Sequence, residues 1–174
     1  RAQFGDDRFS FDYQSCRFVG VNNCDDEGIS DSDLRFIDRE LTRPGAHHRF
    51  VVLHTPPIFF ETSAGPAFRR PRKEPRGFSH NLDSFQSLMI RHQVDCVFVG
   101  HDHGFADRYF GLVRYIITGG GGAPLHHFPW LTSKHHYIAV HISTAPPRFE
   151  VIWRDPNEWR RQPLTPPTPS WKNR

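Results

Sequence analysis

VFVGHDH, at residues 97–103, combines a short apolar strand with two histidines one residue apart. Neutral imidazoles are good ligands for zinc, iron, nickel and manganese-type ions, and Gly100 allows a tight turn that lets His101 and His103 face one small volume. With 12 histidines in 174 residues, chance alone supplies about one such pair. The strand-end position therefore carries more weight than the spacing, because ligands of open α/β sheets bind beyond the carboxyl ends of the strands.

A second apolar run also ends in a histidine. Residues 50–54 read FVVLH, and Thr55-Pro56-Pro57 then stops the strand. Such a continuous run is typical of a strand that is buried on both faces. Two strands of this kind bring His54, His101 and His103 to one edge of one sheet. We therefore expect a metal site at that edge.

The segment between these strands predicts a helix. Its buried face is marked by four apolar residues, Leu82, Phe85, Leu88 and Met89. Asn81 stands at the position of an N-cap. Strand, helix and strand in this order form a βαβ unit, so the two histidine-bearing strands should be parallel.

The other elements are expected on both sides of this unit. Strands are expected at 9–13, 16–21, 105–110, 112–118, 137–143 and 149–153. Ser30 and Asp33 form a capping box for a helix that ends at Pro44-Gly45. The four glycines at 119–122 lack the Lys-Ser/Thr of a phosphate-binding P-loop. We interpret them as a loop that approaches the site closely.

Three further groups of residues carry side chains that could bind a metal ion or a phosphate. The acidic residues 25–27 favour a solvated loop over a metal site. The basic run at 69–76 either folds over the site to hold a phosphate or forms a surface loop stiffened by proline. His47 and His48 lie in the predicted turn before the 50–54 strand and receive no role.

Together these motifs resemble a known family. VLHTPP at 52–57, VGHDHG at 99–104 and YIITGGGG at 115–122 resemble the second half of the calcineurin-like metallophosphoesterases, over about Phe9 to Arg154. The resemblance implies an α/β chain that forms the C-terminal part of an α/β/β/α sandwich, with a mixed sheet, flanking helices and a C-terminal β-hairpin. The domain is expected at 1–154. A Pro-rich tail at 155–174 should pack loosely or not at all.

The resemblance also implies a binuclear centre of Mn, Fe or Zn ions that hydrolyses a phosphoester of a small molecule or a protein. His54 and His101 would ligate one ion and His103 the other, and Arg108 would lie near the substrate. Asp102 has the chemistry of a partner that orients a metal ligand. Such an ion polarises the phosphoryl group and activates a water molecule.

The family's other motifs are expected upstream of residue 1. These are its D-x-H segment, its G-D-x-x-D bridging aspartate, and the G-N-H-[DE] motif with its asparagine ligand and protonating histidine. This chain should thus carry about half of the site, bind metal weakly and turn over little substrate. The missing half would also leave an apolar face exposed, which favours aggregation.

Composition narrows the function classes further. The net charge is +3, the pI is near 9.0, and only three of the 22 Lys and Arg residues are lysines, which favours anionic ligands slightly. A solvated, arginine-rich surface is the simpler account of this composition. The three cysteines form no C-x-x-C motif, and the apolar runs are too short to span a bilayer. The chain lacks a starting methionine, so a processed or exported parent stays open.

Three alternatives remain beside the enzyme. One is a non-catalytic module of this fold that binds proteins. Another is a structural zinc site in which a fourth histidine, from 126, 127, 135 or 136, joins the three. Nucleic-acid binding through residues 69–76 ranks lowest because no aromatic residues interleave with the arginines.

Overall fold

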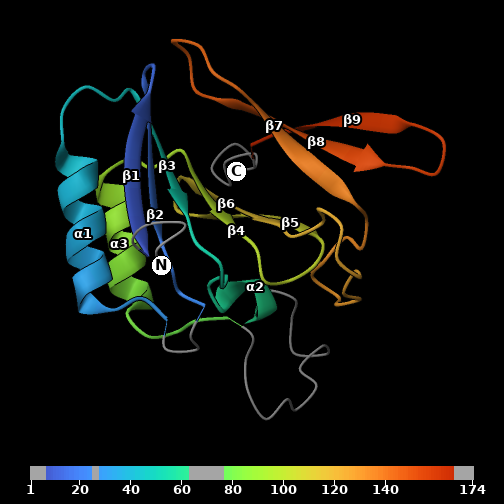
Figure 1. The fold of residues 1–174 in the computed structure, drawn as a ribbon, viewed down its shortest axis with the longest axis horizontal. Helices are drawn as coiled ribbons and strands as arrows, with labels where there is room; N and C mark the ends of the chain where they lie inside the picture. Colours follow the sequence, from blue (N-terminus) through green and yellow to red (C-terminus); the bar gives the residue numbers. More distant parts are fainter. Residues whose placement is uncertain (1–6, 25–27, 63–76, 167–174) are drawn as a thin grey trace, which may run out of the picture.

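The structure is a computed structural model that describes residues 7–24, 28–62 and 77–166. Its main sheet has the strand order β1-β2-β3-β4-β6-β5 (Figure 1). The strands are β1 (Arg8–Tyr13), β2 (Cys16–Val21), β3 (His48–Val52), β4 (Cys96–Val99), β5 (Phe105–Phe110) and β6 (Val113–Thr118). Neighbours from β2 to β6 are parallel, and β1 and β5 are antiparallel edges. The predicted mixed sheet and the parallel βαβ unit are confirmed.

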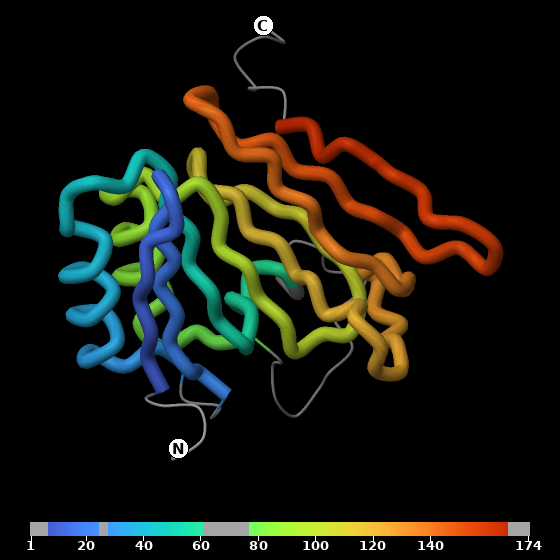
Figure 2. The backbone as a smooth tube through the Cα atoms, turned by 45° about the horizontal axis from the view of Figure 1, so that its top comes forward, coloured from blue at the N-terminus to red at the C-terminus, as the bar shows by residue number. Residues whose placement is uncertain are grey.

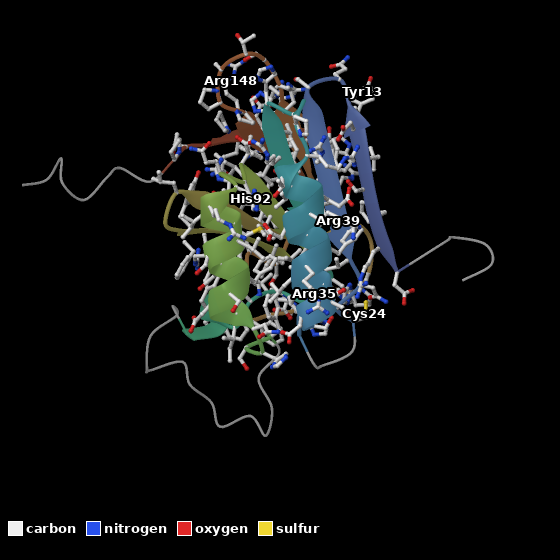
Figure 3. All side chains as sticks on the ribbon, turned by 90° about the vertical axis from the view of Figure 1, so that its left-hand side faces the viewer. Tyr13, Cys24, Arg35, Arg39, His92 and Arg148 are labelled. Carbon is white, nitrogen blue, oxygen red and sulfur yellow. The ribbon has the colours of Figure 1, made fainter. Side chains whose placement is uncertain are left out.

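Two helices cover one face of this sheet, α1 (Asp31–Thr42) and α3 (Leu82–Arg91) (Figure 3). A short helix, α2 (Phe59–Thr62), lies between β3 and α3. The helices lie side by side, and His92 Nε2 at the end of α3 is 2.7 Å from Asp38 Oδ1 of α1. Apolar residues from both helices and the sheet, among them Val51, Val97 and Phe85, form the larger core. None of the helices in the described ranges is long and apolar enough to cross a membrane.

The two helix N-termini differ from each other. Ser30 and Asp33 form the predicted capping box, with Asp33 N–H donating to Ser30 Oγ at 3.1 Å. The prediction that Asn81 caps α3 is wrong, because its backbone is left-handed (φ +57°) and its side chain makes no capping bond. Asn81 Nδ2 instead donates to Ile29 O at 2.9 Å and to Asp31 Oδ1 at 2.8 Å. It links the loop before α1 to the start of α3.

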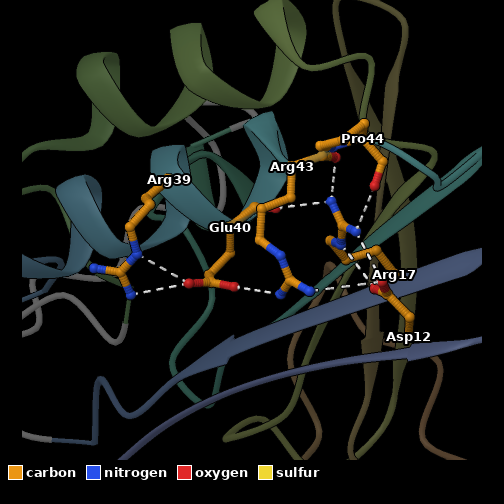
Figure 4. A network of polar contacts seen from close by, with 6 residues as sticks. All are labelled: Asp12, Arg17, Arg39, Glu40, Arg43 and Pro44. Atoms are coloured by element: carbon orange, nitrogen blue, oxygen red, sulfur yellow. Dashed lines mark hydrogen bonds and ion pairs between the residues drawn. The ribbon is translucent and has the colours of Figure 1, made fainter.

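A buried arginine closes the other end of α1 (Figure 4). The Arg17 side chain is 1% exposed and makes two bonds to the Asp12 carboxylate, at 2.7 and 2.8 Å. It also donates to the carbonyls of Glu40 (3.0 Å), Arg43 and Pro44 (3.1 Å). A cation at this end of a helix is favoured because the last carbonyls lack helical partners and carry the negative end of the helix dipole.

A second sheet covers the opposite face, with strands β7 (His136–His141), β8 (Arg148–Arg154) and β9 (Trp159–Leu164) (Figure 2). The two sheets bury the smaller core, which includes Cys16, Cys96 and Trp153. The chain thus has three layers: helices, six-stranded sheet and three-stranded sheet. The expected C-terminal hairpin is confirmed as β7 and β8.

The expectation that residues 155–174 pack loosely is wrong for β9. Its six residues pair with β8, and Trp153 Nε1 donates to Gln162 Oε1 at 2.8 Å. Pro163 fits there because β9 is an edge strand of its sheet, where a missing N–H is tolerated. Residues 167–174 lie outside the described part, and where the domain ends stays a prediction.

An aromatic face continues beyond the second sheet onto β1. Phe9, Phe11 and Tyr13 alternate along the strand on the side away from α1, and are 45%, 50% and 65% exposed. The Phe11 ring stacks on Phe18, and Phe18 stacks on Phe50. That an N-terminal half of the fold would cover these rings stays a prediction.

Candidate metal centre

The parallel strands β3 and β4 bring two histidines together at their carboxyl ends. Pairing continues past both strands, since Leu53 N–H donates to Phe98 O and Gly100 N–H donates to His54 O, each at 2.9 Å. The His54 and His101 rings are nearly perpendicular, with His54 Nε2 and His101 Nδ1 3.3 Å apart. Nitrogens that bind one tetrahedral zinc-like ion at about 2.0–2.1 Å lie about 3.3–3.4 Å from each other. The geometry of the pair fits two ligands of one ion.

His101 has an unusual backbone conformation. Its φ is +60°, in the left-handed region, and Asp102 N–H donates to Gly100 O across it at 2.6 Å. The tight turn is therefore made by His101, whereas the sequence analysis assigned it to Gly100. A Cβ at Gly100 would meet ordinary contacts, at 3.7 Å from His54 Nδ1. Left-handed residues other than glycine cost free energy and cluster at functional sites.

His103 is held apart from this pair by a loop after β6. Its Nδ1 lies 2.8 Å from Pro124 O, so Nδ1 carries the proton and the Nε2 lone pair is left for an ion. The backbone of His103 bonds to His126 in both directions, at 2.8 and 3.1 Å. The two rings stack with centroids 4.3 Å apart. In the sequence, His126 is a candidate only for a fourth zinc ligand, and no pattern there indicates this contact.

Asn23 is a second residue that the sequence analysis missed. Its side chain is fully buried, and Oδ1 accepts from the N–H groups of His54 (2.8 Å) and Thr55 (2.9 Å). Asn23 Nδ2 donates to Thr55 O at 3.0 Å, and Thr55 Oγ1 donates back to Asn23 O at 2.9 Å. These bonds fix the backbone that carries His54. One signal was available: Asn23 lies two residues after the end of β2, at the same sheet edge as the histidines.

The glycine loop approaches the histidine loop closely, as predicted. A Cβ at Gly119 would lie 2.2 Å from Asp102 O, and one at Gly120 would lie 2.2 Å from His136 Nδ1. Gly119 N–H donates to Gly104 O at 3.0 Å. A side chain at Gly119 would push the backbone of Asp102 and His103 away, because backbone atoms cannot move aside as a flexible side chain does. A side chain at Gly120 would instead meet the His136 ring and Lys134 O.

The remaining predicted residues lie as follows. Asp102 is fully buried, with Oδ1 3.6 Å from His126 Nδ1. Arg108 is half-buried on β5, opposite Tyr115 of β6, and its guanidinium donates to Asp107 O at 2.9 Å. His48 was expected in a turn, but it is the first residue of β3 and 5% exposed, with Nε2 2.8 Å from Ser143 O. Residues 25–27 and 69–76 lie outside the described part.

The described residues do not complete a metal site by themselves. Within 7–24, 28–62 and 77–166, no group of three or more His, Cys, Asp or Glu side chains is arranged to hold an ion. The structure brings His54 and His101 together. His103, two residues after His101, contacts Pro124 and His126 instead. His135 and His136 have other neighbours: His135 Nδ1 is 3.1 Å from Gly120 O, and the His136 ring packs on Phe105.

Comparisons with known proteins support the fold. No family model and no curated protein sequence matches the chain. A purple acid phosphatase from yellow lupin (Lupinus luteus) seeds matches with a TM-score of 0.66 and 14% identity, over 90% of this chain and 31% of that one. GAP50, the anchor in the inner membrane complex of Plasmodium, matches with a TM-score of 0.62 and 14% identity, over 94% and 54%. This chain therefore spans about half or less of these proteins, and the likeness concerns the fold.

Proposed function

From its fold, which is part of the calcineurin-like metallophosphoesterase fold, we propose that this chain forms part of a metal-dependent phosphoester hydrolase with a binuclear centre. The observation that carries the proposal is the 3.3 Å approach of His54 Nε2 and His101 Nδ1 at the carboxyl edge of β3 and β4. Two ring nitrogens at this separation have the spacing of ligands that share one ion.

In this proposal His54 and His101 hold one ion and His103 offers Nε2 to the other. Bound Mn, Fe or Zn ions would supply Lewis acidity to the phosphoryl group and a reactive water molecule. Asn23 fixes the backbone of His54, and Pro124 O fixes the ring of His103. Arg108 and the basic run at 69–76 are proposed to contact the substrate phosphate, because guanidinium groups bind phosphate oxygens in a bidentate manner.

The remaining ligands are proposed to lie N-terminal to residue 1, as the resemblance implies. The chain by itself should then bind metal weakly and turn over little substrate, of which mono- and diesters are both candidates. A protein-binding module without catalytic activity is the second candidate, because GAP50, the anchor in the inner membrane complex of Plasmodium, shares the fold. Dependence of metal binding on the histidines separates the two candidates.

The test measures metal content and hydrolysis for the same samples. The chain is equilibrated with Mn²⁺ or Zn²⁺, analysed for bound metal, and assayed with a chromogenic phosphodiester, as wild type and as His101→Ala and His103→Ala. We expect each substitution to weaken metal binding at least about tenfold, because it removes a ligand. His127→Ala, at an exposed histidine, is the matched control and should bind metal like the wild type.

Equal metal binding by the wild type and both alanine variants would reject the proposal and favour the binding module. Tight stoichiometric zinc whose removal unfolds the chain would instead identify a structural zinc site.

A further inference from the structure

The loop that follows β6 holds His103 by its backbone. His126 N–H donates to His103 O at 2.8 Å, and His103 N–H donates to His126 Nδ1 at 3.1 Å. The two residues are 23 positions apart in the sequence. A reciprocal pair of this kind fixes the position of one residue relative to the other, because each bond limits the rotation that the other allows.

The same loop favours one tautomer of each ring. A backbone N–H can only donate, so His126 Nδ1 must accept, and its ring proton is on Nε2. Asp102 Oδ1, at 3.6 Å from His126 Nδ1, lies beyond hydrogen-bond distance. A carbonyl can only accept, so His103 Nδ1 donates to Pro124 O at 2.8 Å. His103 is thereby left with its lone pair on Nε2, the atom proposed to bind an ion.

Ring packing holds His126 itself in place. The His126 ring lies nearly parallel to that of His103, with an interplanar angle of 17°, and it also contacts Phe128, at 5.3 Å between centroids. Phe128 in turn stacks on Trp130 at 4.8 Å. The His126 side chain is 27% exposed. Four aromatic rings thus run in contact from His103 to Trp130.

We infer that His126 is a positioning residue: by accepting the backbone N–H of His103 it keeps the His103 ring where Nδ1 donates to Pro124 O, the orientation and tautomer in which Nε2 meets an ion. The inference rests on the proposed function, because it concerns how His103 is presented to metal. Partners that orient a ligating histidine typically raise metal affinity about 10- to 100-fold.

The test uses the full chain labelled with ¹⁵N at histidine. His126→Asn places Oδ1 near the position of Nδ1 and keeps the acceptor. His126→Gln carries the same amide one methylene further out and misplaces it. His126→Phe keeps the ring and removes the acceptor, and His127→Ala is the control at the neighbouring exposed histidine. The ring nitrogen resonances of metal-free His103 report its tautomer, and a Zn²⁺ titration reports binding at His103 and His54 separately.

We expect the wild type, His126→Asn and His127→Ala to show one His103 tautomer, with the proton on Nδ1, and similar Zn²⁺ affinity. The Gln and Phe variants should show mixed tautomers and about 10- to 100-fold weaker Zn²⁺ binding at His103, with His54 little changed. If His126→Phe unfolds, the Asn and Gln pair decides the question.

The test distinguishes a failure of the positioning role of His126 from a failure of the proposed function. If all variants keep the single tautomer and the wild-type affinity, the positioning role is wrong and the proposed function stands. If the resonances of wild-type His103 do not respond even to a large excess of Zn²⁺ while its tautomer still follows residue 126 as expected, His103 is not a ligand, so the proposed function fails and the positioning role stands.

Discussion

His136 begins β7 with its ring against Phe105 and Trp153, at centroid distances of 5.4 and 5.5 Å. It is 4% exposed, its Nδ1 lies 2.9 Å from Lys134 O, and its Nε2 has no hydrogen-bond partner among the described residues. Burial lowers the pKa of His136 below its usual value of 6.5, against a smaller upward effect of the bond to Lys134. The ring is therefore neutral in the folded chain near neutral pH.

This burial predicts sensitivity to acid. Below the unfolded pKa of 6.5 the unfolded chain binds a proton that folded His136 does not, so the free energy of unfolding falls as the pH drops from 6.5 toward the lowered folded pKa. Urea unfolding at about pH 7.5 and about pH 5.5 measures the loss. His136→Phe should reduce the loss between the two pH values, and His127→Phe should leave it unchanged. An unchanged loss in His136→Phe would mean that other groups cause it.

At the carboxyl ends of β3 and β4, hydrogen bonds to backbone groups hold the three histidines in place. Asn23 holds the backbone of His54, and His126 holds that of His103. His101 is held in a left-handed conformation by the turn from Gly100 to Asp102. The roles of Asn23 and His126 have no pattern of spacing in the sequence, because each residue comes from a distant segment that packs alongside.

At the scale of elements, α1 depends on β2 for the closure of its C-terminus. The guanidinium of Arg17 reaches the last carbonyls of α1 and of the residues after it, while Asp12 of β1 neutralises it (Figure 4). The hydrogen bonds from Arg17 lower the pKa of Asp12. The antiparallel edge pair β1–β2 and the helix therefore share one polar contact.

Arg17→Met should remove the polar contact between the C-terminus of α1 and the β1–β2 pair. The carbonyls of Glu40, Arg43 and Pro44 would lose a charged donor in a buried place, so we expect the free energy of unfolding to fall by about 2–4 kcal/mol. Urea denaturation measures it. Arg39→Met is the control: this arginine is 67% exposed, and its partner Glu40 keeps the bond from Arg43 at 2.8 Å, so its loss should cost less than about 1 kcal/mol. Equal effects of the two substitutions would contradict the capping role.

At the scale of the whole molecule, one buried arginine links the two sheets. Arg114 of β6 is 3% exposed, and its Nη2 donates to Leu164 O at 3.2 Å and Thr165 O at 3.1 Å. Its guanidinium also lies over the rings of Tyr109 and Phe149, at 4.8 and 4.9 Å from their centroids. The end of β9 is thus tied to β6 of the main sheet.

Removing β9 should destabilise the whole fold. A chain that ends at Arg154 leaves Arg114 without two charge-assisted bonds and exposes the edge of β8, so we expect it to be about 2–4 kcal/mol less stable than a chain that ends at Pro166. Because both chains lack 167–174, the difference measures residues 155–166 alone. Equal unfolding midpoints in urea would mean that β9 adds nothing to stability.

The sequence by itself determined the framework of this protein. Apolar runs at 50–53 and 96–99 with a periodic helix between them specify a parallel βαβ unit, and the capping box fixes the start of α1. These features follow from the sequence because periodicity and capping are local properties of the chain. The fold family also followed from motifs at the strand ends, since the carboxyl ends of parallel strands share one edge.

Tertiary structure alone decided which polar groups meet. The pairing of His126 with His103, the clamp from Asn23 to His54, the burial of Arg17 and the addition of β9 to the second sheet all join segments that are far apart in sequence or that read as loops and tails. Such contacts depend on which backbone N–H and carbonyl groups the packed elements leave unpaired. Which groups are left unpaired is decided only when the layers pack together. The sequence therefore located the sheet edge that carries His54, His101 and His103, and the structure showed which contacts hold these residues there.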